Sequence, residues 1–261
     1  KTIPASQIMI ILGILGSAFF VTAAIMTKQP IISRDLLDKH VIIRTLGDLF
    51  GALFFVSAIV LTPLSSASAI LQGTPLAVTA GAALFLGEAV GLRRWLAVLV
   101  GFIGIILIIK PGVADFSPLS LLAVAAVICL SARDLATRAM TDALPTITIS
   151  IYAFLALAMA GVLAIPFYGS FVSPGLDECA LFMLGISSGV VAYYLIVGAT
   201  RYGDASLIAP FRYTRLVFAM VLSLSILGER PDLFTWIGAS VIVLSGYFIA
   251  LRERSIKKVE R

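Results

Sequence analysis

The chain alternates between long apolar runs and short polar breaks. A helix needs about 20 apolar residues to cross the hydrocarbon core of a bilayer, and nine runs reach or approach that length. They lie at roughly 5–26, 41–61, 66–87, 93–110, 117–138, 147–168, 179–198, 204–227 and 233–251. Backbone polar groups find no water in hydrocarbon, so such runs fold as helices, and the alternation of a membrane β-barrel is absent from them. The pattern predicts an all-α integral membrane fold with nine helices in this chain.

Part of this pattern occurs twice. Residues 57–110 contain an apolar run, a short charged break and a second apolar run, and residues 198–251 repeat that order. A shift of about 141 positions aligns Gly87 with Gly228, Glu88 with Glu229, and Trp95 with Trp236. Weak repetition of one half of a hydrophobic chain in the other half is typical of secondary transporters built from repeats.

The composition agrees with a lipid environment. The chain is 60% hydrophobic and only 13% charged, with a mean hydropathy of +1.09. A soluble domain carries about 25% charged residues, so this chain could not cover a globular surface, and a soluble enzyme is excluded. Cys129 and Cys179 both lie in apolar runs, without the spacing of a disulfide framework or a metal site. The basic residues are scattered among loops and the tail, which indicates membrane topology and not nucleic-acid binding.

Lysine and arginine predict the orientation. Counting nine spans back from a cytoplasmic tail places 14 of the 19 basic residues in the tail or on the cytoplasmic side and three outside. This bias predicts a bacterial inner-membrane protein with a cytoplasmic C-terminus. It also predicts that Glu88 lies at the cytoplasmic face and Glu229 at the outer face.

The repeat implies a larger unit. The second repeat, 117–254, holds five spans and is followed by a basic tail at 255–261, whereas the first repeat, 1–112, holds four. We expect a ten-helix fold of inverted five-helix repeats whose first helix precedes residue 1, with a pseudo-two-fold axis in the membrane plane.

Two segments resemble a known family. The run TPLAVTAGAALFLGEAVGLRRWLAVLVGFIGIILIIKPG at 74–112 is similar to the end of an EamA domain, the repeat of the drug/metabolite transporter superfamily. Residues 206–254 resemble the end of a second EamA domain. The resemblance implies a ten-helix carrier of small organic solutes with both termini in the cytoplasm. Within the superfamily, the stretches at 132–138 and 210–219 resemble carriers of S-adenosylmethionine or riboflavin.

Arg212 and Arg215 are the sharpest candidate site. They are three residues apart on one expected helix, so they share a face, and Tyr213 lies between them. A charge in the membrane interior is costly and usually faces a cavity, where these guanidiniums would bind a carboxylate or phosphate of the substrate. The alternatives are an ion pair with Asp48 or Asp204, or extension of the side chains to the inner interface.

Other polar residues in the spans extend this hypothesis. Gln72 and Thr74 fall on the first-repeat counterpart of the arginine segment, so Gln72 is a candidate substrate contact or an interhelical hydrogen-bond donor. Tyr193 is a further candidate for lining the substrate path. Asp48 could couple transport to protons, or it could pair with Arg44 one turn earlier on the same helix.

The remaining charged residues suggest structural roles. Glu88 and Glu229 are expected to form loop ion pairs with nearby arginines, and Arg133 and Asp134 to do the same near the cytoplasmic end of their span. No catalytic, metal-binding or nucleotide-binding motif is present, so we expect no cofactor and no enzymatic activity.

These observations predict an inner-membrane secondary transporter of a small anionic or zwitterionic solute. Its partners would be that solute and the lipid bilayer, without nucleic acid, and a homodimer is an open alternative. The rival hypotheses are an exporter of apolar or cationic compounds, a non-transporting membrane scaffold and an intramembrane enzyme.

Overall fold

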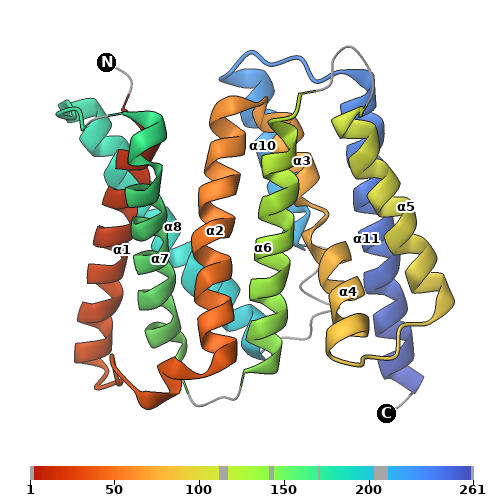
Figure 1. Cartoon of the computed structure of the whole chain (residues 1–261), viewed down its shortest axis with the longest axis horizontal. Coiled ribbons are helices and arrows are strands. Elements are labelled where there is room, and N and C mark those ends of the chain that lie inside the picture. The colour runs from red at the N-terminus through yellow and green to blue at the C-terminus, as the bar shows by residue number, and fades with distance from the viewer. Residues whose placement is uncertain (1–2, 112–116, 141–143, 170, 203–210, 260–261) are drawn as a thin grey trace. The chain divides into compact units, whose positions relative to one another are not determined.

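The structure, a computed structural model, describes residues 3–111, 117–140, 144–169, 171–202 and 211–259, and these residues form helices and loops without a strand. The helices are α1 (Ala5–Met26), the short 3-10 helix η1 (Arg34–Leu37), α2 (Lys39–Leu61), α3 (Leu64–Leu71), α4 (Thr74–Phe85), α5 (Leu92–Ile109), α6 (Ser120–Ala139), α7 (Thr146–Tyr168), α8 (Leu176–Tyr202), α10 (Thr214–Ser225) and α11 (Leu233–Val259). Figure 1 shows their arrangement within the chain.

The predicted membrane spans correspond to these helices. Eight helical segments are long and apolar enough to cross a bilayer, with α3 and α4 counted together as one span, and α10 is a shorter apolar helix within the predicted run 204–227. The all-α integral membrane fold is therefore confirmed. Proline begins several of these helices, because its fixed φ and missing amide hydrogen suit the positions before and within the first turn. Pro4, Pro63 and Pro145 directly precede α1, α3 and α7.

The described chain forms two compact units, each built from both halves of the sequence. The first unit comprises residues 1–53 and 136–202, and the second comprises residues 54–135 and 203–261. Helices α2 and α6 contribute residues to both units. The units thus differ from the two sequence repeats, whose limits at 1–112 and 117–254 stay a prediction.

In the first unit, α1 lies along α7 (Figure 1). Their contact is close, since a Cβ atom on Gly13 or Gly161 would collide with the backbone of the other helix. Phe20 of α1 and Phe154 of α7 form part of the buried core, with ring centroids 5.6 Å apart. By the offset of 141 residues, α1 and α7 are the equivalent helices of the two repeats, so the first unit is built around a pair of equivalents.

The second unit is built in the same way around α5 and α11, the last helix of each repeat (Figure 1). Gly104 and Gly238 face one another, and a Cβ atom added to either would collide with the carbonyl oxygen of the other. Two backbones can approach this closely in a membrane only where side chains are absent. The surrounding core includes Leu76, Val98 and Ile242, all of which are buried.

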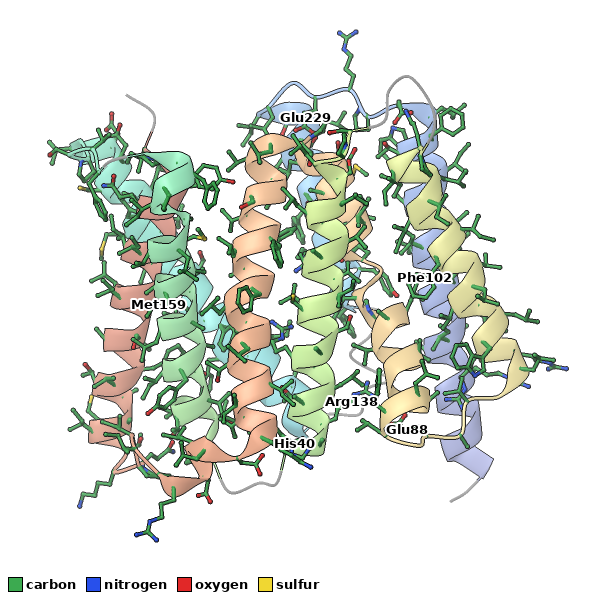
Figure 2. The ribbon with its side chains drawn as sticks, viewed as in Figure 1. His40, Glu88, Phe102, Arg138, Met159 and Glu229 are labelled. Carbon is green, nitrogen blue, oxygen red and sulfur yellow. The ribbon has the colours of Figure 1, made fainter. Side chains whose placement is uncertain are left out.

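The Gly-Glu motif forms the same turn in both repeats. Gly87 and Gly228 have φ of +69° and +64°, a left-handed conformation that favours glycine. After each glycine the glutamate amide donates back to the helix it follows, from Glu88 to Ala82 O at 3.1 Å and from Glu229 to Ser223 O at 3.0 Å. Figure 2 shows Glu88 and Glu229 at opposite ends of the second unit. Equivalent turns at opposite ends are the arrangement expected of inverted repeats.

Candidate functional site

The candidate site lies in the second unit, where the fourth helix of each repeat is interrupted. Helix α3 ends at Leu71 and α4 begins at Thr74, while Phe211 and Arg212 are helical and the turn residue Tyr213 separates them from α10. The two interruptions are closed by the same hydrogen bond, from a threonine hydroxyl to the carbonyl oxygen three residues earlier. These bonds run from Thr74 to Leu71 and from Thr214 to Phe211, each at 2.7 Å. Interrupted helices with exposed backbone groups at membrane depth are typical of transporter binding sites.

The two interruptions also correct the alignment of the repeats. The offset of 141 places Gln72 on Tyr213, whereas the matching threonine bonds are 140 residues apart and place Gln72 on Arg212. The difference arises after the helices: Leu86 alone separates α4 from Gly87, whereas two residues separate α10 from Gly228. The inserted residue restores the offset of 141 at the glycine turn.

Gln72 joins the two interruptions. Its side chain is buried, and its amide nitrogen donates to the backbone carbonyl of Arg212 at 3.2 Å. Its amide oxygen lies 3.5 Å from the Nη2 atom of Arg215, a long and weak hydrogen bond. The structure therefore brings Gln72 together with Arg212 and Arg215, as the repeat suggested, although with a register shifted by one residue.

Arg212 pairs with a carboxylate that the sequence analysis assigned elsewhere. Its Nη2 atom lies 2.9 Å from Oδ2 of Asp134 in α6. The other oxygen of Asp134 accepts hydrogen bonds from Nε and Nη2 of Arg133, at 2.9 and 2.8 Å. The predicted pair of Asp134 with Arg133 is therefore formed, but Asp134 is only 8% exposed and is held between two guanidiniums.

Arg215 has a different environment. Its guanidinium lies over the ring of Phe55 in α2, with Cζ 5.7 Å from the ring centroid, a cation–π geometry. Arg215 is exposed, and among the described residues no carboxylate lies within ion-pair distance of it. A cation on an aromatic ring, without a bound carboxylate, is suited to receive the anionic group of a ligand.

Tyr213 is placed deeper than its neighbours. It is 5% exposed and packs against α11 at Gly246, where a Cβ atom would collide with its hydroxyl. In the described part of the chain the hydroxyl has no hydrogen-bond partner. The predicted role of Tyr213 as a substrate contact stays a prediction, and the same holds for Gln72, Arg212 and Arg215.

Two predicted site residues, Asp48 and Tyr193, both contact Arg44 in the first unit. The Nη1 atom of Arg44 lies 3.0 Å from Oδ2 of Asp48, and its Nη2 atom donates to the hydroxyl of Tyr193 at 2.9 Å. The exposed fraction of Arg44 is 3% and that of Asp48 is 7%. The ion pair within α2 is thus formed, and Tyr193 is connected to it. The ring of Tyr193 also packs edge-on against Phe154, with centroids 5.4 Å apart.

The two halves of the chain each match one sequence profile. The profile of the EamA-like transporter family covers residues 1–110 and 118–251. The chain belongs to this family. The EamA-like chain is 30% identical over 213 residues to an S-adenosylmethionine uptake transporter of Rickettsia bellii, covering 82% of this chain and 72% of that protein. It is 32% identical over 203 residues to a riboflavin transporter of Vibrio cholerae, covering 76% and 66% of the two chains.

A solved crystal structure shares the fold of this EamA-like chain. It superposes with a TM-score of 0.68 at 22% sequence identity, over 96% of this chain and 90% of the other. The predicted membership in the drug/metabolite transporter superfamily is confirmed, and the chain is a multi-pass membrane transporter of a small molecule.

The chemistry available to this transporter is electrostatic. Among the described residues, the site in the second unit combines the guanidiniums of Arg133, Arg212 and Arg215 with the carboxylate of Asp134. Within the described ranges, no group of three or more histidine, cysteine, aspartate or glutamate side chains could hold a metal ion.

Proposed function

We propose that this EamA-like protein is an inner-membrane carrier of a small anionic or zwitterionic organic solute, which binds at the interrupted helices of the second unit. The observation that carries the proposal is the contrast between the two arginines. Arg212 is occupied by Asp134 at 2.9 Å, whereas Arg215 has a ring and an amide as neighbours and no carboxylate among the described residues. Arg212 already has an anionic partner, so the guanidinium of Arg215 is the one that attracts a ligand anion.

The surroundings of Arg215 indicate the class of solute. Phe55 offers an aromatic face, and Gln72 offers an amide beside the guanidinium. A solute with a planar heteroaromatic ring and a carboxylate or other polar group fits both. One relative is named as an S-adenosylmethionine uptake transporter and another as a riboflavin transporter, which supports import of a nucleoside-like or flavin-like solute by this chain.

The repeats suggest how the solute crosses. The interruption between Leu71 and Thr74 allows α3 and α4 to tilt separately, and rocking of one repeat against the other about the site would expose it to each face in turn. We place the C-terminus in the cytoplasm because of the positive-inside bias. Asp48 is the candidate proton carrier: its carboxylate would separate from Arg44 and bind a proton in its place. The chain would act as a carrier, would catalyse no reaction and would bind no nucleic acid. A homodimer remains a proposal for the assembled state.

Ligand binding tests the proposal. We expect S-adenosylmethionine or riboflavin to raise the melting temperature of the purified chain, since saturation at 100 times the dissociation constant stabilises a protein by about 2.7 kcal/mol. The substitution R215Q should abolish the shift while leaving the ligand-free melting temperature near that of the unmodified protein. Stabilisation only by cationic, apolar dyes, unaffected by R215Q, would overturn the proposal in favour of an exporter.

Uptake into vesicles tests the coupling. Under a proton gradient of the same direction relative to the protein, right-side-out membrane vesicles should take up the bound solute, and inside-out vesicles should release it. The substitution D48N should make transport independent of pH. Transport by D48N that keeps its full pH dependence would exclude Asp48 as the proton carrier.

A further inference from the structure

Among the described residues, Asp134 is the carboxylate of the site, and the proposed function gives it no part in binding or release of the solute. It lies in α6, is 8% exposed, and accepts from two guanidiniums through different oxygens. Arg133 is its neighbour on the same helix and moves with it. Arg212 belongs to a different element, the helical residues before α10. Of the two ion pairs of Asp134, the one with Arg212 is therefore the one that can open.

The pair is linked directly to the proposed anion receptor. Gln72 accepts from Arg215 and donates to the backbone carbonyl of Arg212, whose guanidinium in turn contacts Asp134. This chain of contacts runs from the guanidinium open to ligand to the buried carboxylate. Breaking the ion pair between Asp134 and Arg212 would therefore affect Arg215 through the side chain of Gln72.

We infer that Asp134 is the resident anion of the site, a positioning residue that holds Arg212 in the empty carrier and competes with the anionic group of the solute for it. The inference rests on the proposed function. A solute carboxylate that reaches Arg215 lies beside a second guanidinium that is occupied by Asp134. Binding is then weaker than two free arginines would give, and release is correspondingly faster. A carrier needs both, because a site that binds its solute too tightly cannot discharge it.

The substitution D134N tests this inference. Asparagine keeps the size and one acceptor oxygen but removes the charge. We expect the affinity for S-adenosylmethionine to rise at least about tenfold, because close charge pairs of this kind are strongly coupled. The maximal uptake rate should fall, so that KM and kcat decrease together. D134E, which restores the carboxylate, should return both values toward those of the unmodified protein.

A matched ligand separates competition from a structural effect. Decarboxylated S-adenosylmethionine differs only in lacking the carboxylate, so its affinity should be unchanged by D134N. D177N is the control, since Asp177 is exposed at the start of α8, in the first unit. All measurements use the full chain in proteoliposomes.

The outcomes are distinct. If the unmodified protein binds the two ligands equally, the proposed function is wrong, and the inference about Asp134 falls with it. If the unmodified protein prefers S-adenosylmethionine but D134N leaves this preference unchanged, or weakens both ligands alike, Asp134 is structural and only the inference is wrong.

A second variant covers the case in which D134N does not fold. Arg133 forms an ion pair with Asp134, and the side chain of Arg133 is 21% exposed. Removing it with R133Q leaves Asp134 to Arg212 alone, so the affinity for S-adenosylmethionine should fall at least about fivefold while that for the decarboxylated ligand stays constant. An unchanged affinity for S-adenosylmethionine in R133Q would overturn the inference.

Discussion

Glu229 caps a helix of the other repeat through Ser65. One oxygen of its carboxylate accepts from the Ser65 hydroxyl at 2.8 Å and from the Ser65 amide at 3.1 Å, and the other accepts from the amide of Leu64 at 2.7 Å. The hydroxyl of Ser223 donates to the same carboxylate. Four donors from two repeats thus converge on the glutamate of the second Gly-Glu motif, at the positive end of α3.

Removing this carboxylate should destabilise the second unit. E229A leaves the first amides of α3 without their acceptor, and the loss of such a cap amounts to about 1–3 kcal/mol. E229Q keeps one acceptor and should lose less. Thermal unfolding of both variants in detergent measures the difference. Equal melting temperatures for E229A and the unmodified protein would contradict the capping role.

Acid should weaken the same contact. Burial raises the pKa of Glu229, but the hydrogen bonds from Ser223, Ser65 and Leu64 outweigh it and lower the pKa below its usual 4.5. A carboxyl whose pKa is lowered by folding contributes stability that is present above pH 4.5 and lost as the pH falls through the lower, folded value. The melting temperature of the unmodified protein should therefore decrease more steeply below pH 4.5 than that of E229Q. Parallel curves for the two proteins would count against this assignment.

Asp232 is a second loop carboxylate with two tasks. Its carboxylate forms an ion pair with Lys110 at 2.5 Å. The same carboxylate accepts hydrogen bonds from the amide and the hydroxyl of Thr235, so Asp232 caps the start of α11. Burial raises its pKa, but the hydrogen bonds from Lys110 and Thr235 lower it to about 2. D232A should lose the cap, worth about 1 kcal/mol, whereas K110M loses only a partly exposed pair and should cost less.

Chemical or thermal unfolding of D232A and K110M ranks the two contacts. The stability that Asp232 contributes should be present above pH 3.8 and disappear as the pH falls toward 2, since its folded pKa lies below the unfolded one. K110M that is less stable than D232A would show that the ion pair, and not the cap, dominates.

The sequence predicted the spans well because a span depends only on length and hydropathy. It predicted less of the site because local partners conceal distant ones. Asp134 has Arg133 beside it and Glu229 has Arg230 beside it, so both were assigned to local ion pairs. The pair of Asp134 with Arg133 is formed, but Asp134 has a second, distant partner in Arg212, and Glu229 binds Ser65. Nothing in a single chain shows that these residues, far apart in sequence, meet.

The register of the repeat shows a related limit. The distinctive identical residues that mark the offset lie at the Gly-Glu turn and at the following tryptophan. The inserted residue lies between α10 and Gly228, where both repeats are apolar, and apolar residues give no signal of where one has been added. Only the matching bonds of Thr74 and Thr214 fix the alignment at the interrupted helices.

The contact between α5 and α11 should not tolerate a side chain at Gly238. Its Cβ atom would meet the carbonyl oxygen of Gly104, which is backbone and cannot move aside. We expect G238A to lower stability by about 1–3 kcal/mol, as overpacking does. G189A is the control, because a Cβ atom on Gly189 in α8 meets no described atom within 4 Å. Similar melting temperatures for the two variants would show that α5 and α11 can separate without loss.

Removing the Tyr213 hydroxyl distinguishes a packing role from a ligand role. The ring is 5% exposed against Gly246, and among described residues its hydroxyl has no partner. A buried hydroxyl without a partner is unfavourable, so Y213F should leave stability unchanged or raise it by up to about 1 kcal/mol. If Tyr213 only packs, the affinity of Y213F for S-adenosylmethionine should equal that of the unmodified protein. If the hydroxyl binds the solute, as the sequence analysis predicted, affinity should fall about tenfold while the ligand-free protein is at least as stable. Measuring both quantities on one preparation decides between the roles, because packing alone cannot lower affinity in a protein that has become more stable.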